Sequence, residues 1–162
     1  PEIIINTGVA GSLTEKLQIF DVALGQNTVQ YDMDTSAIGD PIGLISGINL
    51  IHIPCDKDIL NLLEQCSKKL NINSLSGTIA SADRFQNKVP EKERIKQKFN
   101  AIACDMESGG IGQVCYVNNV KCGIIRAISD TADDSSHMEY MEFLSKAAVK
   151  SKEIVIEFLK NI

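Results

Sequence analysis

The stretch that decides the fold is Gly123-Ile-Ile-Arg-Ala-Ile-Ser-Asp130-Thr-Ala-Asp133. Its apolar residues form a short continuous run that is typical of a buried strand, and the run stops at Ser129 and Asp130 before a polar loop. An arginine inside such a strand and a carboxylate at its end are costly unless they are paired or used. Ligands of open α/β sheets bind at the carboxyl ends of the strands, which favours a functional role for Asp130. An ordinary helix N-cap is the alternative interpretation.

A second apolar run, residues 101–104, also ends in acidic residues, Asp105 and Glu107. The segment 108–117 that follows is predicted to be a helix in spite of its three glycines. Each glycine costs about 1 kcal/mol in a helix relative to alanine, so these glycines indicate the close approach of another group. Two strands that end in carboxylates suggest one shared pocket, and such a pair suits the binding of sugar hydroxyls and of an oxocarbenium-like transition state. Two solvated strand ends are the alternative.

The rest of the chain alternates between strand-like and helix-like segments. We expect strands over residues 2–6, 21–25, 28–31 and 77–81, and helices over 56–70, 90–99 and 140–160. The first of these helices has Asp56 or Asp58 as its candidate N-cap. This alternation predicts an α/β fold in which crossover helices cover a central sheet. Residues 31–52 form a connection that is too long to be idle, which indicates a functional or interfacial role.

Length and composition limit the classes of protein that remain. The 162 residues suffice for one domain with a real core. The net charge of −5 gives no basic footprint for nucleic acid, and no apolar run reaches the length of a membrane span. Five cysteines without a CxxC pair favour reduced thiols and a cytoplasmic location. We expect no metal site, because buried thiols more often act as small apolar residues; the alternative set of ligands would be Cys104, Cys115, Cys122 and His137.

Three motifs in this chain resemble those of one enzyme family. The motifs are Ile5-Asn-Thr-Gly-Val-Ala-Gly11, Cys104-Asp-Met-Glu-Ser108 and Arg126-Ala-Ile-Ser-Asp130-Thr-Ala-Asp133. They resemble the methylthioadenosine/S-adenosylhomocysteine nucleosidases of the nucleoside phosphorylase/hydrolase superfamily, in the expected order and at comparable spacing from Pro1 to the last helix. The resemblance implies a three-layer α/β/α fold with a central mixed sheet, no cofactor and a cytoplasmic homodimer. It also implies that residues 31–52 contribute to the dimer interface and help to cover the alkylthio end of the substrate.

The resemblance also bears on the start of the chain. Members of the family carry several dozen residues before the position of Pro1, including the first strands and a glutamate that activates the attacking water. We therefore expect residues 1–162 to be a single nucleosidase domain that is incomplete at its N-terminus. Such a sheet would leave strand edges and apolar surface uncovered, and the chain alone is expected to be less stable or inactive.

The reaction implied by the resemblance is hydrolysis of the N-glycosidic bond of methylthioadenosine and S-adenosylhomocysteine, with release of adenine. Asp130 matches the general acid that delivers a proton toward the purine N7, and Ser129 is placed to orient its carboxyl group. Glu107 matches the residue that accepts hydrogen bonds from the ribose hydroxyls. Arg126 matches a residue near the attacking water; a buried ion pair with Asp105 or Glu107 is the structural alternative, and both can hold together.

The other matching positions are expected to line the nucleoside pocket. Phe85 matches an aromatic residue that stacks on adenine, and the backbone of Gln86 would read the edge of the base. Met106 would lie under the ribose, with simple core filling as the alternative. The resemblance adds Val9, where many relatives have serine, Ala10 and Gly11 around the ribose and water, Asp105, where many relatives have glutamate, and Tyr140, which would close over the nucleoside.

Two other functions remain open at this point. A purine nucleoside phosphorylase of the same superfamily must bind a phosphate dianion, usually with several arginines. This chain has only Arg84, Arg94 and Arg126, and none follows Asp130, which favours hydrolysis. The other possibility is a nucleoside-binding domain without catalysis, which would not need a proton donor at N7. The sequence leaves open which thioribosyl nucleoside, or aminodeoxyfutalosine, is preferred.

Overall fold

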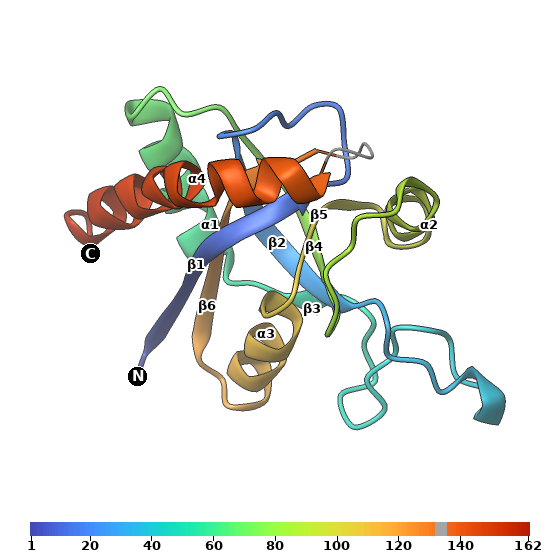
Figure 1. Ribbon diagram of the computed structural model, residues 1–162. Helices are drawn as coiled ribbons and strands as arrows, with labels where there is room; N and C mark the ends of the chain where they lie inside the picture. The colour runs from blue at the N-terminus through green and yellow to red at the C-terminus, as the bar shows by residue number, and fades with distance from the viewer. Residues whose placement is uncertain (132–135) are drawn as a thin grey trace.

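The computed structural model describes residues 1–131 and 136–162, with side chains up to Thr131 and from Phe143 onward. In this part of the chain, six strands form one sheet in the order β3-β2-β4-β5-β1-β6 (Figure 1). The strands are β1 (Ile3–Ser12), β2 (Val22–Gln30), β3 (Ile53–Pro54), β4 (Ser74–Ser81), β5 (Ala101–Asp105) and β6 (Lys121–Asp130). The helices are α1 (Lys57–Lys69), α2 (Val89–Phe99), α3 (Ser108–Val117) and α4 (Ser136–Leu159), with a short 3-10 helix at Ser36–Ile38.

The sheet is mixed, as the resemblance implied. Strand β4 runs parallel to β2 and to β5, and β1 runs parallel to β6. Antiparallel pairs join β1 to β5 and β2 to β3. Strand β2 also pairs antiparallel with β6, with Val22 opposite Ala127. The sheet is therefore strongly curved, and the strands from β2 to β6 close into a barrel. The sequence predicted the mixed sheet but not this curvature.

Helices cover the sheet on both faces, which confirms the three-layer prediction. Helices α1 and α4 lie side by side against one face, and α3 lies on the opposite face (Figure 1). Successive side chains of β6 point to opposite faces: Ile125 and Ala127 pack with α1 and α4, and Ile124 packs on the side of α3. Both faces of β6 are therefore buried, which explains its continuous apolar sequence.

Local contacts explain where two of the helices lie. The Asp56 carboxylate accepts hydrogen bonds from the backbone N–H groups of Asp58 and Ile59, both at 3.0 Å, which settles the N-cap of α1. Helix α3 has the predicted bounds. A Cβ on its Gly109 would lie 2.7 Å from Gln30 Cγ, and one on Gly112 would lie 2.6 Å from Thr28 Oγ1, so these two glycines permit the close approach of the helix to β2. A Cβ on Gly110 would meet nothing within 4 Å, so the prediction does not hold there.

Other elements differ from their predicted lengths. Strands β1 and β4 are longer than expected, and β2 is one continuous strand across an irregularity between Gly25 and Asn27. Residues 31–52 extend away from the sheet (Figure 1, cyan), and Ile38 in this segment is 81% exposed. Within the residues that the structure describes, no helix has both the length and the apolar character needed to cross a membrane.

Near the end of α4, Glu157 is buried between two lysines. Lys69 Nζ lies 2.5 Å from its Oε1, and Lys160 Nζ lies 3.1 Å from its Oε2. The hydrogen bonds from Lys69 and Lys160 lower the pKa of Glu157 from 4.5 to about 2. Because the folded state favours the ionised form, this contribution to stability is complete above the ordinary pKa and is lost as the pH falls toward about 2.

Replacing Glu157→Gln is therefore expected to lower the Tm at about pH 7, by an amount that shrinks as the pH falls below about 4.5. Thermal unfolding followed by circular dichroism from about pH 3 to 7 measures this difference. Glu153→Gln is the matched control, because Glu153 lies on the same helix in an exposed pair with Lys150 and should contribute little. A Tm difference that did not change with pH would contradict the assignment.

Candidate active site

The carboxyl ends of three strands meet at one place in the sheet. Strands β1 and β5 pair antiparallel near their carboxyl ends, where Gly11 lies opposite Cys104. Gly11 is also the partner of Asp130 at the end of β6. Ser81 at the end of β4 pairs with Asp105 at the end of β5. The two acidic motifs therefore come together at the edge of the sheet where α/β proteins bind ligands.

Two adjoining hollows, which together form the cavity of the candidate site, open at this edge. Their shared lining consists of Gly11, Phe85, Cys104, Asp105, Met106 and Asp130. One hollow adds Val9, Ala10, Glu107 and Ser129, and the other adds Arg84 and Gln86. The structure thus brings together all the site residues singled out from the sequence except two. Arg126 lies behind the hollows, and the side chain of Tyr140, like that of His137, lies outside the described residues.

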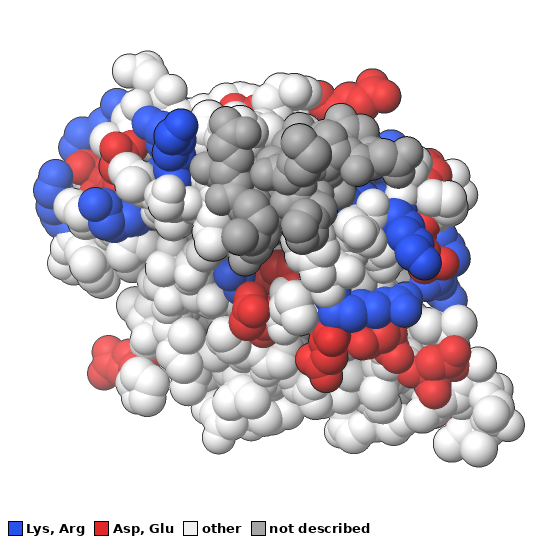
Figure 2. Space-filling model, viewed as in Figure 1, with Lys and Arg blue, Asp and Glu red and all other residues white. Residues whose placement is uncertain are grey.

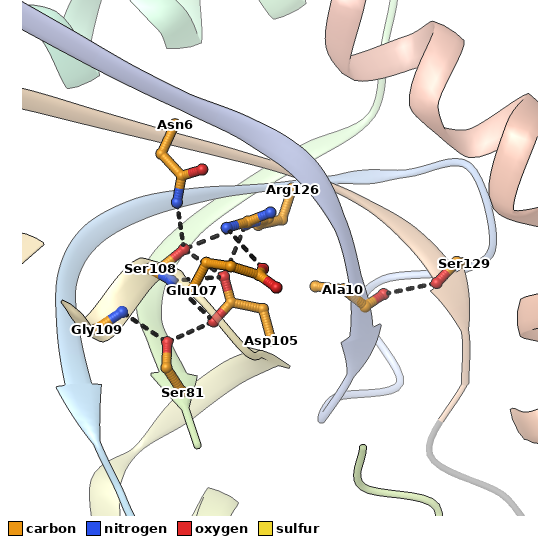
Figure 3. Close-up of polar contacts among 9 residues, drawn as sticks. All are labelled: Asn6, Ala10, Ser81, Asp105, Glu107, Ser108, Gly109, Arg126 and Ser129. Atoms are coloured by element: carbon orange, nitrogen blue, oxygen red, sulfur yellow. Dashed lines mark hydrogen bonds and ion pairs between the residues drawn. The ribbon is translucent and has the colours of Figure 1, made fainter. Parts of the chain in front are cut away.

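Arg126 points from β6 into a buried polar network next to the cavity (Figure 3). Its Nε lies 2.7 Å from Asp105 Oδ2, and its Nη2 lies 3.4 Å from Glu107 Oε2. Nε also donates a hydrogen bond to Ser108 Oγ at 3.1 Å. Both ion pairs considered for Arg126 are present. The side chains of Arg126 and Asp105 are only 4% and 1% exposed, so this pair is shielded from water.

Besides its ion pair with Arg126, the Asp105 carboxylate makes several hydrogen bonds. It accepts hydrogen bonds from the hydroxyl groups of Ser81 and Ser108, and from the backbone N–H of Ser108 at 3.2 Å. Ser81 Oγ accepts in turn from the N–H of Gly109 at 2.7 Å (Figure 3). A carboxylate is well placed here, because the N-terminus of α3 carries unsatisfied N–H donors and a positive dipole end. Asp105 therefore fixes both Arg126 and the start of α3.

Two glycines of β1 leave room for these charged groups. A Cβ on Gly8 would lie 2.2 Å from Arg126 Nη1, and a Cβ on Gly11 would lie 2.7 Å from Asp130 Oδ2. The first distance is far below any contact that a real Cβ makes, so any larger residue at Gly8 would displace the guanidinium group. The group that approaches Gly11 is thus the Asp130 carboxylate.

Asp130 is buried at the end of β6, with a relative exposure of 1%. Ser129 Oγ donates a hydrogen bond to Asp130 Oδ1 at 3.0 Å. Asp130 Oδ2 lies 3.2 Å from Nζ of Lys92, a residue of α2 that is itself buried. Sequence reasoning missed Lys92, because α2 has the composition of a solvated, charged helix. The available signal was its spacing from Ile95 and Phe99, three and seven residues further on, which places all three on one helix face.

The remaining site residues differ in exposure. Glu107 has a side chain that is 59% exposed, and Phe85 and Met106 are exposed by 39% and 44%. Cys104 also lines the cavity, but burial raises the pKa of its thiol to about 12, which keeps it protonated near neutral pH. Among the described residues, no cluster of His, Cys, Asp and Glu side chains has an arrangement that could hold a metal ion.

Comparisons with known proteins agree with this fold. The phosphorylase superfamily matches residues 1–160. The curated 5′-methylthioadenosine/S-adenosylhomocysteine nucleosidase of Haemophilus ducreyi is 39% identical over an alignment 162 residues long. The alignment covers 99% of this chain and 69% of that protein. The aminodeoxyfutalosine nucleosidase of Campylobacter jejuni is 35% identical over 161 residues, covering 99% of this chain and 70% of that protein.

A solved structure is similarly close. It is the Helicobacter pylori 5′-methylthioadenosine/S-adenosylhomocysteine nucleosidase, as an aspartate-to-asparagine variant with 5′-methylthioadenosine in the active site. The TM-score is 0.95 at 32% identity, over 99% of this chain and 69% of that one. The chain therefore belongs to the phosphorylase superfamily. Within that superfamily it groups with the 5′-methylthioadenosine/S-adenosylhomocysteine nucleosidases, as its three motifs indicated.

Replacing Arg126→Met is expected to lower the free energy of unfolding by about 3–5 kcal/mol, because it leaves the buried Asp105 carboxylate without its cation. Chemical denaturation with urea measures this loss. Glu107→Gln, which removes the charge of the exposed partner of the same arginine, is the control and should cost less than about 1 kcal/mol. Equal losses in the two variants would show that burial does not distinguish the two ion pairs.

Proposed function

We propose that this protein hydrolyses the N-glycosidic bond of 5′-methylthioadenosine and S-adenosylhomocysteine and releases adenine. The observation that carries the proposal is the meeting of β1, β5 and β6, which places Asp130 and Glu107 on one cavity. Cleavage of this bond requires protonation of the leaving base, stabilisation of a cationic ribosyl group and a positioned water. We infer that the single domain of residues 1–162 supplies the groups for the first two of these requirements, Asp130 and Glu107.

Asp130 is the general acid in this proposal. Its carboxyl group delivers a proton toward N7 of the purine, which makes adenine a neutral leaving group. Ser129 supports this role, because its hydroxyl holds one carboxyl oxygen at 3.0 Å. Phe85 stacks on the adenine ring from the rim of the cavity, and the backbone of Gln86 reads the edge of the base.

Glu107 and Arg126 act on the sugar side. Glu107 accepts hydrogen bonds from the ribose hydroxyls, and its negative charge stabilises the oxocarbenium ion. Arg126 orients Glu107 through the 3.4 Å ion pair and lies near the attacking water. The rest of the pocket is lined by Met106 under the ribose, by Val9, Ala10 and Gly11 around the ribose and water, and by Asp105. The resemblance assigns the cover over the nucleoside to Tyr140, whose side chain lies outside the described residues.

The arginines favour hydrolysis over phosphorolysis. Arg126 is already committed to Asp105 and Glu107. Arg84 and Arg94 both pair with Glu91 near the surface. Phosphate recognition normally uses arginines that are free to form bidentate hydrogen bonds.

Figure 2 shows acidic side chains grouped in the lower half of this face and basic ones flanking them, without the basic stripe of a nucleic-acid-binding surface.

The test is adenine release from 5′-methylthioadenosine in phosphate-free buffer, followed by chromatography. For this chain joined to the segment that members of the family carry before the position of Pro1, we expect release without phosphate, and Asp130→Asn should abolish it while nucleoside binding, measured by calorimetry, is largely retained. The asparagine keeps the shape of the side chain but has no proton to donate. Release that depended on added phosphate would support a phosphorylase instead. Near-normal turnover by Asp130→Asn would remove Asp130 from the mechanism.

We further propose that the protein is a homodimer, in which the segment 31–52 forms part of the interface. This segment matches the interface segment of the family, extends away from the sheet (Figure 1) and carries the exposed Ile38. Val114 and Val117 on the outer surface of α3 are also more than half exposed. Exposed apolar side chains of this size commonly mark interaction sites. The five free thiols fit a cytoplasmic location, where the reaction would serve methionine salvage.

Replacing Ile38→Asp is expected to shift the dimer to monomer, because a charge would be buried at the interface. Analytical ultracentrifugation measures the state directly. Ile162→Asp is the matched control, since Ile162 is 65% exposed at the end of the chain and lies outside the proposed interface. A parent protein that sediments as a monomer would contradict the homodimer. A dimer that survives Ile38→Asp would place the interface elsewhere.

A further inference from the structure

Lys92 is a buried cation at the catalytic end of the sheet. Its side chain is 1% exposed, whereas Lys88 and Lys98 of the same region are exposed and the side chain of Lys96 is half-buried. The ammonium group contacts Asp130 Oδ2 at 3.2 Å and donates a hydrogen bond to the carbonyl oxygen of Thr131. Asp130 is the last residue of β6, and Thr131 follows it directly. Burying a charge is expensive unless it is paired, so this contact accounts for the position of the lysine.

The helix fixes Lys92 in this position. Ile95 and Phe99, on the same face of α2, are 0% and 2% exposed and pack in a cluster with residues of β4 and β5. Phe85 and Gln86 lie only a few residues before the start of α2 at Val89. The contact between Lys92 and Asp130 therefore connects the segment proposed to bind adenine with the group proposed to protonate it.

We propose that Lys92 is a positioning residue for Asp130, which holds its carboxylate in place and sets the pH range in which Asp130 can donate a proton. The inference rests on the proposed function, in which Asp130 is the general acid. An ammonium group next to a carboxylate favours the ionised form, which has no proton to give. Lys92 thus limits the activity at high pH and directs one oxygen of Asp130 away from the base.

The other charged side chains among the described residues of this cavity are Asp105, Glu107 and Arg84, the last of which is largely exposed and pairs with Glu91. The group that faces Asp130 from β5 is the Cys104 thiol, which is neutral near pH 7 because its pKa is raised to about 12. Strand β1 contributes only Gly11 at this point. Glu107 and Asp105 line the same cavity, and both pair with Arg126.

The first experiment compares Lys92→Met with Lys96→Met. Methionine keeps the length of the side chain without its charge, and the Lys96 side chain, on the same helix, is 43% exposed. We expect Lys92→Met to move the high-pH fall of kcat/KM for adenine release upward by about one pH unit or more. Lys96→Met should leave the profile unchanged. A Lys92→Met variant with kcat/KM lowered by the same factor at every pH would have only a structural role, and the inference would be overturned.

A second experiment needs no catalysis and uses a double-mutant cycle of thermal unfolding. Lys92→Met should lower the Tm of the parent protein, because it leaves Asp130 buried without its cation. In the Asp130→Asn background the lysine has lost its charged partner and keeps only the Thr131 carbonyl, so the same substitution should leave the Tm unchanged or raise it. Equal losses in both backgrounds would overturn the inference, even if the protein releases adenine.

The cycle also covers the case in which Lys92→Met alone does not fold. The variant with both substitutions removes the two charges together, so the inference predicts that it folds; an unfolded double variant would overturn it. Absence of adenine release by the parent protein, together with a coupled cycle, would instead count against the proposed function and leave the Lys92–Asp130 contact established.

Discussion

The buried ion pair between Arg126 and Asp105 is the interaction on which the rest of the site depends. A guanidinium group inside a sheet is tolerated only when charge and hydrogen bonds compensate for the loss of water. Here the compensation comes from several elements at once, because Ser81 of β4 and Ser108 of α3 donate to the same carboxylate. Asn6 of β1 donates to Ser108 at 3.2 Å (Figure 3). The pair therefore sets the relative positions of the strands whose ends form the cavity.

The charges of the site follow a simple pattern. The two buried acids each have a buried cation, Arg126 for Asp105 and Lys92 for Asp130, so these pairs cancel. Glu107 is the acid that remains at the opening, and it shares Arg126 only at the longer distance of 3.4 Å. The net charge of this group is consequently negative and lies at Glu107. A positive charge that develops on a ribosyl group in the cavity would be stabilised there.

Much of this arrangement could be predicted from the sequence, because it depends on patterns of neighbouring residues. The strands that end in Asp105 and Asp130 show continuous apolar runs, and α3 follows the first of them with the predicted bounds. The antiparallel pairing of β2 with β6 could not be predicted, because contact between strands about a hundred residues apart leaves no periodic signal in either one. The same limit applies to the length of β1, since Thr7 and Gly8 interrupt its apolar pattern.

The two buried cations show why one was recognised and the other was not. Arg126 interrupts an apolar strand, where a charged side chain conflicts with its neighbours and therefore indicates a structural or functional role. Lys92 lies in a helix rich in charged residues, where one more lysine conflicts with nothing, and only its spacing from Ile95 and Phe99 places it on the buried face. The first turn of α2, a few residues after the segment proposed to bind adenine, brings Lys92 to the end of β6. The less visible cation is thus the one that can link binding of the base to the state of its proton donor.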